Sequence, residues 1–129
     1  MNQNTSNWHK IVKNKDVNLL SEILDDEVMF HSPVLHAPQK GKKLTQLYLQ
    51  AALHVFLPGD FKYVREVEND LHSILEFELE LDGIKINGVD MISWNDDGKI
   101  IDFKVMIRPL KAINLIHQKM GEILMRSQK

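Results

Sequence analysis

The sequence predicts an α+β fold: a cone-shaped, curved antiparallel sheet wrapped around three N-terminal helices, plus a C-terminal helix. Apolar residues recur at spacings of three and four up to about residue 55, which is the period of helices. From residue 61 to residue 107 they alternate with polar residues, which is the period of strands. Turn residues divide this second region into consecutive strands, as in an antiparallel meander.

Length and composition are those of one globular domain spanning residues 1–129. The net charge of −2 offers no attraction for nucleic acid or an anionic membrane. Cysteine is absent, which excludes disulfides, and the six histidines have no metal-site spacing. No apolar run approaches the ~20 residues of a membrane span. We therefore expect a cytoplasmic domain with no metal, no cofactor and neither a membrane nor a nucleic-acid partner.

Three helices are predicted in the first half of the chain. Thr5 or Ser6 can cap the first and Asp16 the second, because short polar side chains accept hydrogen bonds from unpaired N–H groups. The third spans residues 42–54 and ends before Pro58. Their inward-facing stripes are Trp8, Ile11 and Val12 in the first; Leu19, Leu20, Ile23 and Leu24 in the second; and Leu44, Leu47, Tyr48, Ala51 and Val55 in the third.

Five strands are predicted, the first of them isolated between helices. It spans residues 27–32, and the segment 34–41 that follows is predicted to be a loop. Glu76, Glu78 and Glu80 alternate with leucines and Phe77, which indicates a sheet with one solvated face. The other strands span residues 61–68, 71–81, 84–94 and 99–107, and the last one ends where Pro109 opens the C-terminal helix.

Asp90 is the least expected residue of the predicted meander. It shares a strand face with Ile92 and Trp94, so its carboxyl group points into an apolar interior. An unpaired buried carboxylate is costly. Either Asp90 has a hydrogen-bonding partner or its pKa is raised and it stays protonated. Both explanations make it a candidate functional residue, and a purely structural carboxyl is the alternative.

Several short features combine in an order and spacing that resemble a known family. They are the early aromatic Trp8; residues 24–28; Ser32-Pro33-Val34 with Pro38 and Gly41 after it; and Val89-Asp90 followed by residues 94–100. Together they resemble the nuclear transport factor 2-like superfamily, and within it the SnoaL-like and ketosteroid-isomerase-like proteins. The resemblance covers the chain up to Pro109 and implies a cone-shaped fold, a ligand cavity and a homodimer formed through the outer sheet face.

The resemblance also implies roles for individual residues. Ketosteroid isomerases use an aspartate base directly before Pro-Val, and a tyrosine and a protonated aspartate that bind the enolate oxygen. Asp90 stands at the position of the protonated aspartate, and Trp8, whose indole N–H is a donor, at that of the tyrosine. Ser32 stands at the position of the base, and a serine hydroxyl does not take a proton at neutral pH unaided. His31 or His36 could supply the base.

The candidate catalytic residues are therefore Asp90, His31 and His36. Strand alternation turns His31 away from Ser32, and a surface role is the alternative for both histidines. The candidate ligand-binding residues are Trp8, Ser32, Tyr48, Phe77, Ile92, Trp94, Phe103 and Val105, for which core packing is the alternative.

Three functions fit this pattern. The first is an enzyme of the isomerase, cyclase or dehydratase type in which Asp90 stabilises a developing oxyanion. The second is a non-catalytic module that binds a small apolar molecule with one polar anchor group. The third is a dimerisation module whose cavity has no ligand.

Overall fold

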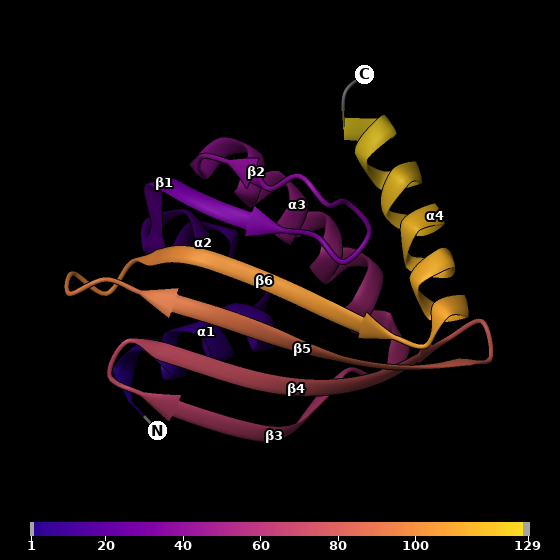
Figure 1. Cartoon of the computed structure of the whole chain (residues 1–129), viewed down its shortest axis with the longest axis horizontal. Helices are drawn as coiled ribbons and strands as arrows, with labels where there is room; N and C mark the ends of the chain where they lie inside the picture. Colours follow the sequence, from indigo (N-terminus) through magenta and orange to yellow (C-terminus); the bar gives the residue numbers. More distant parts are fainter. Residues whose placement is uncertain (1, 128–129) are drawn as a thin grey trace.

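The computed structural model describes residues 2–127, which fold into helices packed against one curved sheet (Figure 1). The helices are α1 (Gln3–Asn14), α2 (Val17–Ile23), α3 (Lys42–Phe56) and α4 (Leu110–Ser127), with a short 3-10 helix, η1 (Leu57–Gly59). The strands are β1 (Leu24–His31), β2 (Gln39–Lys40), β3 (Lys62–Asn69), β4 (His72–Leu81), β5 (Ile84–Trp94) and β6 (Ile100–Arg108). The predicted α+β class is confirmed.

The strands form one sheet in the order β2-β1-β6-β5-β4-β3. The predicted meander is present, because β3, β4, β5 and β6 pair in succession as antiparallel neighbours. The sheet is mixed, however, because one of its strand pairings is parallel, and the predicted antiparallel sheet did not include this pairing. Strand β1 joins it parallel to β6, with Phe30 opposite Phe103. The two strands are far apart in the sequence, and the alternation of polar and apolar residues within each strand does not depend on which strand it pairs with. The sequence therefore did not indicate this pairing.

Most predicted boundaries agree with the structure to within two residues, and three local features differ by more. Asn2, not Thr5 or Ser6, caps α1, because its side-chain oxygen accepts the N–H of Thr5 at 2.9 Å. Leu24 is already extended, so β1 begins three residues before the predicted position 27. Part of the predicted loop 34–41 forms β2, which pairs with Met29 and Phe30. The predicted cap of α2 is confirmed, because Asp16 accepts the N–H of Leu19 at 3.0 Å.

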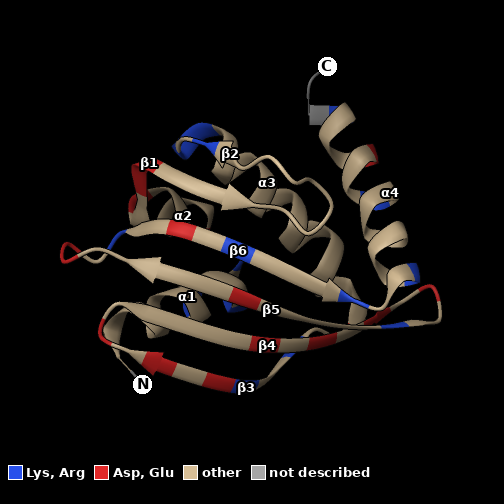
Figure 2. Cartoon of the chain, in the orientation of Figure 1, with Lys and Arg blue, Asp and Glu red and all other residues tan. Residues whose placement is uncertain are grey.

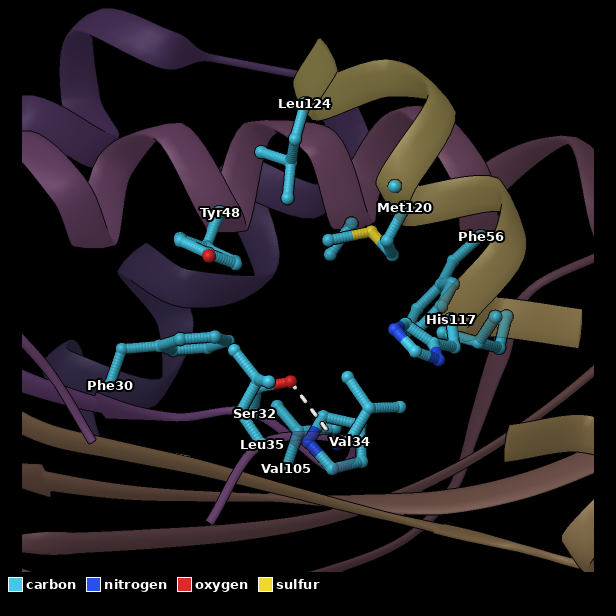
Figure 3. Close-up of a pocket in the computed structure, with 14 residues that line it drawn as sticks. Phe30, Ser32, Val34, Leu35, Tyr48, Phe56, Val105, His117, Met120 and Leu124 are labelled. Atoms are coloured by element: carbon cyan, nitrogen blue, oxygen red, sulfur yellow. Dashed lines mark hydrogen bonds between the residues drawn. The ribbon is translucent and has the colours of Figure 1, made fainter. Parts of the chain in front are cut away.

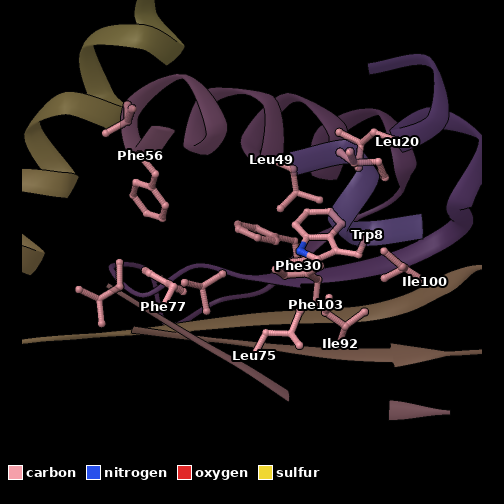
Figure 4. Packing of buried hydrophobic residues seen from close by; sticks show 14 of the residues in the cluster. Trp8, Leu20, Phe30, Leu49, Phe56, Leu75, Phe77, Ile92, Ile100 and Phe103 are labelled. Atoms are coloured by element: carbon pink, nitrogen blue, oxygen red, sulfur yellow. The ribbon is translucent and has the colours of Figure 1, made fainter. Parts of the chain in front are cut away.

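The core lies between the concave face of the sheet and helices α1, α2 and α3 (Figure 4). The predicted alternation of β4 is confirmed: Leu75, Phe77 and Leu79 are buried, whereas Glu78 and Glu80 are exposed. The inward-facing residues of β5 and β6 continue the apolar layer that Leu75, Phe77 and Leu79 begin. Burial of this layer on one face only is what holds the helices on that face.

Helix α4 stands at the end of the sheet where β6 ends and packs beside α3 (Figure 1). Ala112 and Ile116 are its buried residues, whereas Leu110 and Met125 are exposed. Acidic residues gather on β3 and at turns, and basic residues are dispersed over β2, α3 and α4 (Figure 2). Within residues 2–127, the structure contains no helix that is both long and apolar enough to span a lipid bilayer.

Gly88 allows the ring of Phe77 to lie across β5. The two residues are paired in the sheet, and a Cβ atom on Gly88 would meet the Phe77 ring and lie 2.7 Å from the backbone oxygen of Met106. No side chain fits there. Phe77 is completely buried and contacts Phe56 at 5.6 Å between ring centres, so the missing side chain at Gly88 positions an aromatic ring on the concave face.

We expect Gly88→Ala to lower the free energy of unfolding by about 2–3 kcal/mol, because the added methyl group overpacks the core. Gly121→Ala is the matched control. A Cβ atom there meets no atom within 4 Å, and alanine stabilises a helix interior by up to about 1 kcal/mol relative to glycine. Urea unfolding of the two variants tests this, and equal effects of the two substitutions would contradict it.

Candidate functional site

A cavity of about 150 Å³ lies between the sheet, α3 and α4 (Figure 3). Its polar side chains are Ser32, Tyr48 and His117. Figure 3 shows Phe30 and Ser32 on one side of it and His117, on α4, on the other. The rest of its wall is apolar and consists of Phe30, Pro33, Val34, Leu35, Ala52, Phe56, Val105, Ile116, Met120, Gly121 and Leu124.

A chain of hydrogen bonds joins α1, β3 and β5 in the protein interior. The indole Nε1 of Trp8 donates to the Tyr63 hydroxyl at 2.8 Å, and that hydroxyl donates to Oδ2 of Asp90 at 2.6 Å. Trp8 is 2% exposed and Asp90 is 5% exposed. Asp90 thus has a partner, as its burial required, but Tyr63 stands between it and Trp8. We refer to these residues as the Trp8–Tyr63–Asp90 chain.

Burial sets the protonation state of this chain. Removal from water raises the pKa of Asp90 to about 7, and the hydrogen bond from Tyr63 opposes this rise. The pKa of Tyr63 is also raised, first by its own burial and then by the nearby Asp90 carboxyl. Both explanations drawn from the sequence therefore hold at once, because Asp90 has a partner and its pKa is raised.

The Trp8–Tyr63–Asp90 chain lies beside the cavity and not in its wall. Asp90 pairs with Val105 across β5 and β6, and Val105 lines the cavity. Trp8 contacts the ring of Phe103 at 5.0 Å between ring centres, and Phe103 contacts Phe30 at 6.1 Å. Phe30 is part of the cavity wall. Aromatic packing therefore connects the buried acid to the cavity.

The predicted ligand-binding residues divide into two groups. Ser32, Tyr48 and Val105 line the cavity. The remaining five, Trp8, Phe77, Ile92, Trp94 and Phe103, are buried core residues outside its wall. Trp94 instead donates its indole N–H to Ser73 at 2.9 Å. The strand pattern identified the inward face, but it could not distinguish the part of that face that helices cover from the part left open.

Neither histidine proposed as a base reaches the cavity. His31 lies on the convex side of β1, where its Nε2 is 2.8 Å from Oδ1 of Asp102. His36 is exposed in the segment before β2. The histidine that does line the cavity is His117 on α4. His117 was not predicted as a site residue, although its place one residue after Ile116 in the last helix was an available signal.

The hydrogen bond of Tyr63 to Asp90 was also not predicted, because the two residues lie 27 positions apart on different strands and no local pattern pairs them. Within residues 2–127, no group of three His, Asp or Glu side chains is placed to hold a metal ion.

A solved structure of a steroid delta-isomerase from Pseudomonas aeruginosa is 31% identical to this chain, with a TM-score of 0.91. The match covers 97% of this chain and 91% of that one. The chain belongs to the nuclear transport factor 2-like superfamily. The resemblance seen in the sequence is thereby confirmed.

Two other solved structures have similar folds. An uncharacterised protein with a cystatin-like fold from Silicibacter pomeroyi is 26% identical, with a TM-score of 0.89, over 97% of this chain and 87% of that one. A SnoaL-like polyketide cyclase from Jannaschia has a TM-score of 0.71 at 10% identity, over 88% of this chain and 91% of that one, and shares the fold alone. No protein-family model and no curated protein sequence matches the chain.

The raised pKa of Asp90 predicts a pH dependence of stability. Its pKa is about 7 in the folded protein against an ordinary value of 3.8, so the folded state retains a proton that the unfolded state releases. This contribution to stability is complete below the ordinary value and is lost as the pH rises through 7.

Asp90→Asn removes this titration and keeps an acceptor for Tyr63. We expect the stability of Asp90→Asn relative to the wild type to rise by about 2–3 kcal/mol between about pH 5 and about pH 8. Urea unfolding at both pH values measures the difference. Asp97→Asn, in an exposed turn, is the matched control. A constant difference for Asp90→Asn would show that Asp90 is ionised throughout this range.

Proposed function

We propose that this protein binds a small, largely apolar molecule in the cavity between the sheet, α3 and α4. The observation that supports this most is the composition of the cavity wall, in which a continuous apolar surface carries the polar groups of Ser32, Tyr48 and His117. Ligand sites have this character: apolar walls bury the ligand, and a few polar groups orient it.

Small residues in the cavity wall also support a ligand. Ala52 and Gly121, two of the smallest residues in the chain, face this space from α3 and α4. A larger residue at either position would remove much of the void, so small residues there favour a binding site over a packing defect.

An isomerase or cyclase type of activity is the second candidate, and the protonation of Asp90 favours it. A carboxyl group with a pKa of about 7 can donate a hydrogen bond to a developing oxyanion near neutral pH. Two contacts favour binding over catalysis. The Tyr63 hydroxyl is already engaged by Asp90 and Trp8. The Ser32 hydroxyl, at the position of the base, accepts the N–H of Val34 at 3.2 Å.

The homodimer implied by the family resemblance is also proposed, through the convex face of the sheet. Ile74, Val89, Met91 and Met106 form adjacent cross-strand pairs there, and Met106 is 51% exposed. Met106→Lys would place a charge in this apolar strip. We expect it to convert a dimer into a monomer in light scattering after size exclusion, whereas a wild-type monomer would refute the dimer.

The cytoplasmic location and the absence of a nucleic-acid partner stay predictions.

Ala52→Leu tests the proposed binding site. Its side chain extends from the wall into the cavity, so we expect at least a tenfold loss of affinity for any ligand bound there, together with unchanged or raised thermal stability. Native mass spectrometry of the wild type for a retained ligand, followed by titration of both proteins, provides the measurement. Unchanged affinity in the variant would place the ligand elsewhere.

A further inference from the structure

The cavity wall carries a polar residue that the family resemblance did not indicate, His117. Among the described residues in its wall, only Ser32, Tyr48 and His117 carry polar side-chain atoms. Ser32 already accepts a hydrogen bond from Val34. Tyr48 packs its ring on Phe30, with 5.7 Å between ring centres. Apart from Tyr48, His117 is the only titratable side chain among the described residues that line the cavity.

His117 is placed to meet a bound molecule at the opening of the cavity. It is exposed, whereas Ile116, its neighbour in sequence, is 2% exposed and packs into the core. Figure 3 shows the imidazole on the α4 side, with Ser32 and Val34 on the opposite side. No hydrogen bond or ion pair engages this imidazole within residues 2–127. Its nitrogen atoms are therefore available both as a donor and as an acceptor.

The size of the cavity limits the apolar part of a ligand. At about 150 Å³ it has the volume of an engineered apolar cavity that binds benzene. One aromatic or aliphatic ring fills such a space. A fused polycyclic molecule such as a steroid is several times larger and would have to leave most of its rings outside.

We propose that the cavity takes a single-ring molecule with an oxygen-bearing polar substituent, and that the His117 imidazole at the opening recognises that substituent. This inference rests on the proposed binding function and adds the class of ligand and its specificity-determining residue. The ring packs among Phe30, Phe56 and Val105, and the substituent points outward between α4 and Ser32. His117 thus serves as the polar anchor of the ligand, a role for which the sequence had suggested Asp90.

The experiment compares two single-ring probes and one polycyclic probe. Toluene and p-cresol have rings of the same size and differ in a hydroxyl group, and progesterone represents a steroid. Binding to the full chain is measured by NMR titration for the wild type and for His117→Phe, which keeps a planar ring and removes both nitrogen atoms. His54→Phe is the matched control, because His54 is exposed on α3 and lies outside the cavity wall.

We expect both single-ring probes to bind the wild type and progesterone not to bind in the cavity. His117→Phe should weaken p-cresol binding about fivefold to tenfold and leave toluene binding unweakened, because only p-cresol loses a hydrogen bond. His54→Phe should affect neither probe.

Each contrary result has a distinct meaning. Equal effects of His117→Phe on both probes, or no effect on either, would overturn the role of His117 and leave the binding function standing. Binding of progesterone in the cavity without the single-ring probes would overturn the class of ligand. Failure of all three probes to bind would overturn the proposed function as well.

Discussion

The hydrogen bond from Tyr63 to Asp90 is the constraint on which the interior of this protein depends. It places a carboxyl group in the middle of an apolar layer and joins the edge strand β3 to the central strand β5. Trp8 completes the arrangement by donating to the same hydroxyl, which fixes α1 against the sheet. Without these partners, the burial of Asp90 would cost several kcal/mol. The three side chains supply one another's hydrogen bonds, so a polar group can be buried in the apolar layer on the concave face of the sheet.

This closure explains why the acid and the cavity are separate. The Tyr63 hydroxyl is already engaged by its partners within the Trp8–Tyr63–Asp90 chain. Phe30 and Phe103 fill the space beside Trp8, and the open volume lies farther along the sheet, under α4. The superfamily fold is retained, as the likeness to the Pseudomonas aeruginosa steroid delta-isomerase shows. In this chain the side chains of Trp8, Tyr63 and Asp90 hydrogen-bond to one another in the interior. The polar groups that line the cavity come from Ser32, Tyr48 and His117.

Much of the fold could be predicted from local patterns. The range of β5, the inward row of β4 and the Asp16 cap follow from alternation and capping, which depend on neighbours in sequence. The parallel pairing of β1 with β6 and the short strand β2 could not be predicted, because they join segments without a local signature. The candidate site was predicted less well. Ser32, Tyr48 and Val105 do line the cavity, but the two histidines proposed as bases do not.

The sequence by itself determined the α+β fold class and the resemblance to this superfamily, and that Asp90 is a buried carboxyl in need of a partner. These conclusions depend on residue type and spacing, which act over a few positions along the chain. Only the tertiary structure decided that the partner is Tyr63, that the acid lies behind the cavity wall, and that His117 stands at the opening. The reason is geometric. Tyr63, Asp90 and His117 belong to three different elements, and the curvature of the sheet and the placement of α4 set the distances between them.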